Sequence, residues 1–148
     1  MSRARDDPTW YTGDMENTTL EVNKETYLAL FDDVMANNAR APYVSRFDSN
    51  DYTYLVSGQT GLVVINHGEG RIEGGGLFND GPSGAGLALL DFAITYYGVN
   101  YVECFAPLNS LYARLGFVVR TQDPFNWEYA PSNWHPSLGT PDYFTMTL

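Results

Sequence analysis

Hydrophobic residues recur every three or four positions in three segments, the spacing of a helix with one buried face. The first segment covers residues 24 to about 37, and Asn23 before it is a favourable N-cap. The second covers residues 84–97. The third covers residues 108–115 and is followed by Gly116, a residue type that often ends helices. The pattern therefore predicts three amphipathic helices.

Extended segments with strand-like composition occupy much of the remaining chain. The seven predicted strands are residues 19–23, 51–57, 61–66, 71–78, 101–106, 117–120 and 143–148. Short glycine-bearing connections make the second to fourth an antiparallel meander. A helical crossover from 71–78 to 101–106 would make those two strands parallel. We therefore predict an α/β fold, with a mixed, mostly antiparallel sheet and helices on both faces.

Two groups of glycines interrupt this pattern. Gly74, Gly75 and Gly76 lie inside a predicted strand, which indicates a β-bulge or the close approach of another backbone. Residues 81–86, Gly-Pro-Ser-Gly-Ala-Gly, lie at the corner before the second helix. Free backbone N–H groups and the helix dipole would make this corner an anion site, most naturally for phosphate, although a simple turn is the alternative.

Size and composition favour one domain over residues 1–148. Residues 1–18 are polar and aperiodic, so we expect a loose N-terminal arm, on which Trp10 and Tyr11 could dock against the body. No apolar run is long enough to span a bilayer, and no signal segment precedes the domain. The single cysteine, Cys104, fits a reducing compartment. These features predict a soluble, cytoplasmic protein without membrane association.

The formal net charge of −10 disfavours direct binding to a nucleic-acid backbone. It is compatible with a cationic substrate such as an amine. An acidic surface that imitates nucleic acid is a weaker alternative, because the acids are scattered. The aromatic content of 15% could include a homodimer patch.

Two motifs carry a resemblance to a known family. Residues 111–117, Leu-Tyr-Ala-Arg-Leu-Gly-Phe, resemble the late Tyr-x-x-x-Gly-Phe signature of the GNAT N-acetyltransferases. Residues 84–86, Gly-Ala-Gly, resemble the end of that family's pyrophosphate motif, Arg/Gln-x-x-Gly-x-Gly/Ala, and the order of the predicted elements is also similar. Two positions depart from the family pattern: Gly81 stands where the motif has Arg or Gln, and Asn109 lies only three residues before Tyr112.

The chain is similar in particular to small GNAT-like proteins that are common in bacteriophage genomes. Residues 141–146, Pro-Asp-Tyr-Phe-Thr-Met, match their recurrent final strand. A phage origin would place the protein in the host cytoplasm.

The resemblance implies transfer of an acetyl group from acetyl-coenzyme A to an amine, on a small molecule or a protein, in a ternary complex. It implies that Tyr112 protonates the departing thiolate, that Glu73 is the general base, and that strand amides near Phe78 stabilise the oxyanion. The backbone amides of residues 83–87 would hold the pyrophosphate. The implied coenzyme A contacts are Leu77, Phe78, Ser83, Gly84, Ala85, Gly86, Leu87 and Asn109.

Other roles for these residues stay open. Tyr112 lies on the apolar face of its helix and could be a core residue or a wall of the cofactor site. Any of the candidate acids could be a solvated surface residue. Further candidates for the base are Glu103, Asp80 and Asp142.

Alternative chemistry is less favoured. Cys104 could be a nucleophile with His67 or His135, but a lone cysteine in an apolar strand is usually buried. Two histidines and one cysteine leave no zinc-ligand spacing. Trp127 and Trp134 could wall an acceptor pocket or simply pack in their loop. The alternative to an enzyme is a binding protein: a catalytically idle GNAT-fold module that binds a host or phage protein through its acidic surface.

Overall fold

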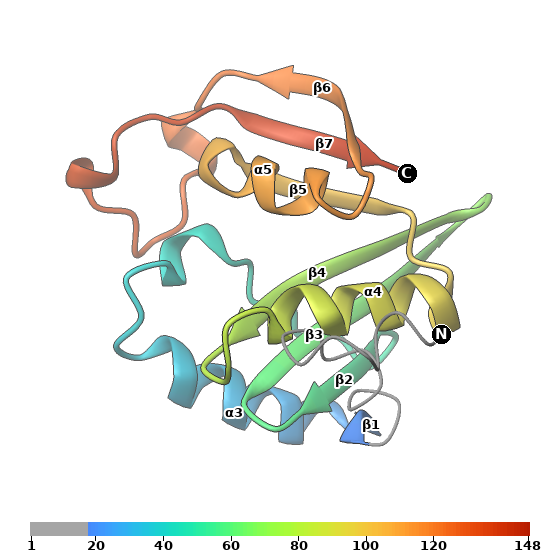
Figure 1. The fold of residues 1–148 in the computed structure, drawn as a ribbon. Coiled ribbons are helices and arrows are strands. Elements are labelled where there is room, and N and C mark those ends of the chain that lie inside the picture. Colours follow the sequence, from blue (N-terminus) through green and yellow to red (C-terminus); the bar gives the residue numbers. More distant parts are fainter. Residues whose placement is uncertain (1–17) are drawn as a thin grey trace.

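The computed structural model describes residues 18–148, which form a seven-stranded mixed sheet with helices on both faces (Figure 1). The strands are β1 (Leu20–Val22), β2 (Thr53–Ser57), β3 (Thr60–Gly68), β4 (Arg71–Asn79), β5 (Tyr101–Phe105), β6 (Val118–Asp123) and β7 (Tyr143–Thr147). The helices are α3 (Lys24–Met35), α4 (Ala85–Tyr97) and α5 (Ala106–Ala113), with short 3-10 turns η1 (Ala41–Tyr43), η2 (Trp127–Tyr129) and η3 (Pro136–Leu138). The predicted fold class is confirmed.

Several predicted boundaries were inexact. β6 extends to Asp123 rather than residue 120, because it pairs with β7 along its length. α5 begins at Ala106, with Pro107 inside its first turn, where proline is tolerated. The predicted N-terminal arm, with Trp10 and Tyr11, lies outside the described residues except for Thr18, and the single domain over residues 1–148 stays a prediction.

The sheet has the order β1-β2-β3-β4-β5-β7-β6, and every neighbouring pair is antiparallel except β4 and β5. The predicted parallel pair is thus confirmed. Within the described chain, these two strands are paired at one position, Glu73 beside Tyr101. Figure 1 shows them close at their N-terminal ends and far apart at their C-terminal ends. The sheet therefore opens toward the end of β4.

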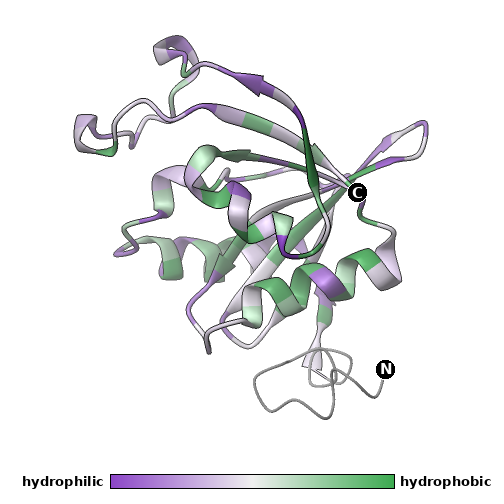
Figure 2. Ribbon diagram, turned by 45° about the horizontal axis from the view of Figure 1, so that its top comes forward, coloured by the Kyte–Doolittle hydropathy of each residue, from purple (hydrophilic) through white to green (hydrophobic). Residues whose placement is uncertain are grey.

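Each face of the sheet buries its own hydrophobic core, and Figure 2 shows hydrophobic residues along the central strands and α4. On one face, α4 and α5 bury residues such as Leu90 and Tyr112 against Val102. On the other face, α3 buries Tyr27 and Phe31. No helix within residues 18–148 combines the length and the apolar character needed to cross a membrane.

The three glycines of β4 are required by both a bulge and close packing. The pairing with β3 shifts register here, and Gly76 has a φ of 56° and accepts a hydrogen bond from Tyr27 Oη at 2.5 Å. A Cβ at Gly75 would lie 2.6 Å from the ring of Phe47, and one at Gly74 would lie 3.1 Å from a Val99 methyl group. The predicted bulge is confirmed, but the close neighbours are side chains rather than another backbone.

Candidate functional site

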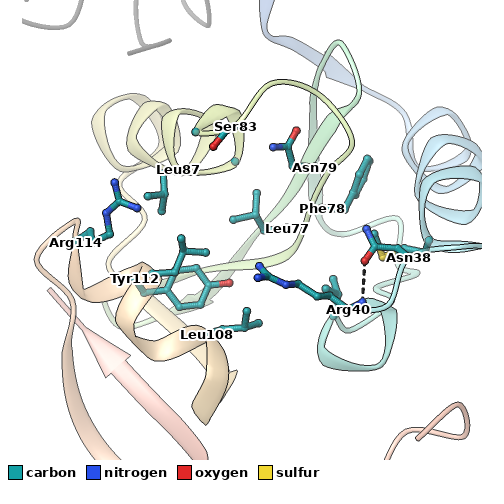
Figure 3. Close-up of a pocket in the computed structure, with 15 residues that line it drawn as sticks. Asn38, Arg40, Leu77, Phe78, Asn79, Ser83, Leu87, Leu108, Tyr112 and Arg114 are labelled. Carbon is teal, nitrogen blue, oxygen red and sulfur yellow. Dashed lines mark hydrogen bonds between the residues drawn. The ribbon is translucent and has the colours of Figure 1, made fainter. Parts of the chain in front are cut away.

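A cavity of about 450 Å³ lies where β4, the start of α4 and α5 face the segment after α3 (Figure 3). We call it the α4 cavity. Among the residues predicted to bind coenzyme A, its lining includes Leu77, Phe78, Ser83, Gly84, Gly86 and Leu87, together with the predicted acid Tyr112. Within the described residues, neither Ala85 nor Asn109 lines it. Ala85 is instead buried in the hydrophobic core.

The N-terminus of α4 presents unpaired backbone donors to this cavity. Gly84 is the N-cap with a φ of 91°, and it has no side chain to cap the helix. Ala85 N–H donates to the Pro82 carbonyl at 3.1 Å, so this amide is occupied within the loop. The N–H groups of Gly86 and Leu87 donate to no backbone carbonyl in residues 18–148. Two free donors at the positive end of a helix can bind an anion.

Asn79, which sequence reasoning missed, holds the loop before α4 in place. Its Oδ1 accepts hydrogen bonds from Gly81 N–H and Thr60 Oγ1, both at 2.8 Å, and its Nδ2 donates to the Pro82 carbonyl at 3.0 Å. A Cβ at Gly81 would lie only 3.2 Å from Asn79 Oδ1. A larger residue at position 81 would therefore press on Asn79. An asparagine two residues before a glycine is a turn signal that could have identified it.

Two arginines that sequence reasoning also missed supply positive charge to the α4 cavity. Arg40 precedes η1 and Arg114 follows α5, and both line the cavity. Within residues 18–148 neither forms an ion pair, whereas Arg46 is held by Asp32 and Asp48. In Figure 3 the Arg40 side chain extends into the cavity. The only local signal was for Arg114, which lies inside the tyrosine motif.

Tyr112 places its hydroxyl group inside the protein at the edge of the cavity. The residue is only 9% exposed, and its hydroxyl makes no hydrogen bond within the described part of the chain. Figure 3 shows this hydroxyl pointing into the cavity toward Arg40. Burial raises the pKa of Tyr112 above its ordinary value. The phenol therefore stays protonated at neutral pH and can donate a proton.

A second cavity, of about 200 Å³, meets the first at Tyr112. We call it the glutamate cavity, because Glu73 and Glu103 line it together with the β4 glycines and Tyr143. The residues that line both cavities are Val44, Leu77, Leu108 and Tyr112. The two cavities therefore adjoin where β4 and β5 separate.

The two glutamates of this cavity differ in burial. Glu73 is 7% exposed, and its Oε1 lies 2.7 Å from His67 Nε2. Burial raises the pKa of Glu73, while the hydrogen bond from His67 opposes that rise. Glu103 is exposed and accepts hydrogen bonds from Tyr101 Oη at 2.5 Å and Tyr143 Oη at 3.3 Å. A buried carboxylate with a raised pKa is a suitable general base.

Charge is segregated between the two cavities. Among the described residues, the α4 cavity is lined by Arg40 and Arg114 and by no acid. The glutamate cavity is lined by Glu73 and Glu103 and by no lysine or arginine. The arrangement can bind an anion on one side of Tyr112 and a cation on the other.

The remaining candidates lie elsewhere. Cys104 is 2% exposed, with its Sγ 3.8 Å from Met146 Sδ, and burial raises its pKa to about 12. It is buried, as its apolar strand indicated, and unsuited to act as a nucleophile. His135 bonds to Ser137 instead. No group of metal-ligating side chains gathers within residues 18–148. Four further candidates line neither cavity: Asp80, Asp142, Trp127 and Trp134.

No protein-family model matches the chain, and no curated protein matches its sequence. A crystal structure from Lactobacillus plantarum described as a "putative N-acetyltransferase" is similar with a TM-score of 0.55 and 17% sequence identity. The likeness covers 88% of this chain and 99% of that chain. The chain therefore has a GNAT-like fold, as its two motifs and the order of its predicted elements indicated. The likeness to phage proteins stays a prediction.

Proposed function

We propose that this protein transfers an acyl group, most simply acetyl, from a coenzyme A thioester to an amine in a ternary complex. The observation that carries the proposal is the buried hydroxyl of Tyr112, which has no hydrogen-bond partner within residues 18–148 and lies at the junction of two oppositely charged cavities. The N-acetyltransferase description of the structural neighbour supports the same reaction class.

The α4 cavity has the groups that a coenzyme A pyrophosphate requires. The free N–H groups of Gly86 and Leu87 offer hydrogen bonds to phosphate oxygens. Arg40 and Arg114 offer the positive charge that Gly81 does not. Leu77 and Phe78 continue the wall toward Tyr112, where the pantetheine arm would lie. The bound coenzyme supplies the acyl group as a thioester.

The glutamate cavity is the proposed acceptor side, and Glu73 is the proposed base. The amine nitrogen attacks the thioester carbonyl carbon, so a C–N bond forms and the C–S bond breaks. Glu73 takes the proton that the nitrogen loses, directly or through a water molecule, and Tyr112 gives its proton to the departing sulfur. Backbone groups of β4 near Phe78, where β5 has moved away, would stabilise the carbonyl oxygen.

Isothermal titration with coenzyme A tests the donor site in a matched pair of variants. A Cβ at Gly86 would meet Asn79 and Leu77 at 3.6 Å or more, so Gly86→Ala should fold and bind within about threefold of wild type. Gly86→Glu would place bulk and negative charge beside the pyrophosphate. We expect its affinity to fall at least about a hundredfold. Equal binding by the glutamate variant and wild type would overturn this site assignment.

The role of Tyr112 is tested by Tyr112→Phe, which removes the proton donor but keeps the ring. We expect kcat to fall about 100-fold while the Kd for coenzyme A stays unchanged. Steady-state rates and titration measure the two quantities separately. A variant that keeps full kcat would show that Tyr112 is a wall residue.

A further inference from the structure

A third cavity, of about 700 Å³, adjoins the acceptor side of the proposed site. We call it the aromatic cavity, because Phe105, Phe125 and Tyr129 line it. It shares Ser45 and Tyr143 with the glutamate cavity. The two spaces therefore adjoin, as the α4 and glutamate cavities do at Tyr112.

The wall of the aromatic cavity is a packed cluster of rings. The centroid of Phe105 lies 5.0 Å from that of Tyr143 and 4.9 Å from that of Trp134. Phe125 lies 5.1 Å from Trp134, and the indole N–H of Trp134 donates to the Gly139 carbonyl at 3.1 Å. Rings held at these distances present a formed apolar surface to a ligand. Trp134 does not line the aromatic cavity in the described chain, but it packs against Phe105 and Phe125, which do.

Tyr143 connects this apolar surface to negative charge. Its ring packs against Phe105, and its hydroxyl donates to Glu103 Oε1 at 3.3 Å. A ligand that spans both cavities would meet the carboxylates of Glu73 and Glu103 at one end and aromatic rings at the other.

The lining also discriminates against other amines. No lysine or arginine among the described residues lines the glutamate or the aromatic cavity, so a substrate carboxylate would find no cationic partner there. This disfavours amino acids. A polyamine's further ammonium group would meet one acid in the aromatic cavity, Asp123, but its chain would leave the rings there uncovered.

We propose that the acceptor is a small primary amine that bears an aromatic ring and no carboxylate. Its nitrogen lies beside Glu73 and Glu103, and its ring occupies the aromatic cavity against Phe105, Phe125 and Tyr129. This inference rests on the proposed function, since it names the acceptor class of the same site.

Binding measurements with four compounds test the proposal in the presence of coenzyme A. The probe is 2-phenylethylamine, and each control changes one feature of it. Butylamine lacks the ring, 2-phenylethanol lacks the amine, and phenylalanine adds a carboxylate. We expect 2-phenylethylamine to bind at least about tenfold more tightly than each control. The same order is expected in kcat/KM for the three amines with acetyl-coenzyme A.

Two variants of residues that line the aromatic cavity test whether the ring of 2-phenylethylamine binds there. Phe125→Ala and Tyr129→Ala should each bring the affinity ratio of 2-phenylethylamine to butylamine toward one. Tyr129 is 81% exposed, so its variant carries little risk to folding. Tyr96→Ala, an exposed tyrosine on α4 that lines none of the three cavities, is the matched control and should keep the ratio.

The outcomes separate this inference from the proposed function. Acyl transfer to butylamine or spermidine with no preference for 2-phenylethylamine would overturn the aromatic acceptor and leave the enzyme class standing. Selective binding of 2-phenylethylamine, lost in Tyr129→Ala, without transfer to any amine would support the site and refute the acyltransferase. An unchanged ratio in both wall variants would overturn the location of the ring.

Discussion

At the scale of single residues, burial raises the pKa of both groups that we propose for proton transfer, Tyr112 and Glu73. Burial raises the pKa of Tyr112, so the phenol stays protonated but becomes a weaker acid. Burial also raises the pKa of Glu73, but this carboxyl group must lose its proton before it can act as a base. The hydrogen bond from His67 limits that rise. The contact with His67 therefore lowers the pH at which the proposed base, Glu73, loses its proton.

The pH profile of kcat/KM tests this role of His67. Burial is the largest cause that raises the pKa of Glu73 and Glu103 adds to it, whereas the contact with His67 and the charge of Arg71 lower it. Replacing His67 with alanine removes a contribution that lowers the pKa, so Glu73 would ionise at higher pH. We expect the acid limb of the profile to move to higher pH than in wild type, with the same acceptor.

His135→Ala is the matched control for this experiment, because His135 is exposed and bonds to Ser137. The acid limb of the kcat/KM profile of this variant should coincide with that of wild type. An acid limb that stays in place in His67→Ala would contradict Glu73 as the titrating base.

At the scale of elements, the two halves of β4 have different neighbours. Its first half pairs with β5 at Glu73, which lines the glutamate cavity, and its second half carries the glycine bulge and lines the α4 cavity. The bulge is anchored from α3 by the hydrogen bond of Tyr27 to the Gly76 carbonyl. A helix on one face of the sheet thus stabilises the strand that lines the proposed site.

Tyr27→Phe should destabilise the fold through this contact. Tyr27 is fully buried, so the variant leaves the Gly76 carbonyl without its partner. We expect the free energy of unfolding to fall by about 1–3 kcal/mol in urea denaturation. Tyr129→Phe, at a tyrosine that is 81% exposed, should change it by less than about 0.5 kcal/mol. Equal stability of the two variants would refute the anchoring role.

The loop before α4 depends on Asn79 in a similar way. Asn79→Ala removes three hydrogen bonds from the loop and releases Gly81 and Pro82. We expect coenzyme A affinity to fall about tenfold, because the free amides of α4 lose their fixed position. The matched control is Asn66→Ala, which removes the turn bond to Gly68 in the β3–β4 hairpin. Titration should show wild-type affinity in this control and a loss only in Asn79→Ala.

At the scale of the whole molecule, opposite charges are kept apart although the chain has a net charge of −10. Arg40 and Arg114 lie on the proposed donor side of Tyr112, and the two glutamates lie on the proposed acceptor side. Two adjoining cavities of opposite charge would allow both proposed substrates to be bound at once. Among the described residues, Cys104 is the only thiol, and its burial removes it from covalent catalysis.

This arrangement predicts the kinetic mechanism. Initial rates measured at several fixed concentrations of the amine should give intersecting double-reciprocal lines, because transfer is direct within a ternary complex. Parallel lines, together with an acylated protein detected by mass spectrometry, would instead require a covalent intermediate. That result would refute direct transfer.

The sequence was sufficient for the elements and their order, because these depend on local periodicity and on turn residues. The α4 helix and its glycine corner follow from the spacing of apolar residues and from residues 81–86. The β4 bulge follows from three consecutive glycines. The parallel pairing of β4 and β5 follows from the crossover helix between them. The Tyr-x-x-x-Gly-Phe resemblance indicated the GNAT-like fold.

Only the tertiary structure decided which side chains share a cavity. Arg40 and Arg114 lie far apart in the sequence, and the packing of η1 opposite α5 brings both to the end of β4. Asn109 lies three residues before Tyr112 on the same helix but does not line the α4 cavity in the described chain. The aromatic cavity likewise joins Phe105 to the loop after β6. Local patterns specify elements, whereas a site depends on how those elements pack, which no short stretch of sequence encodes.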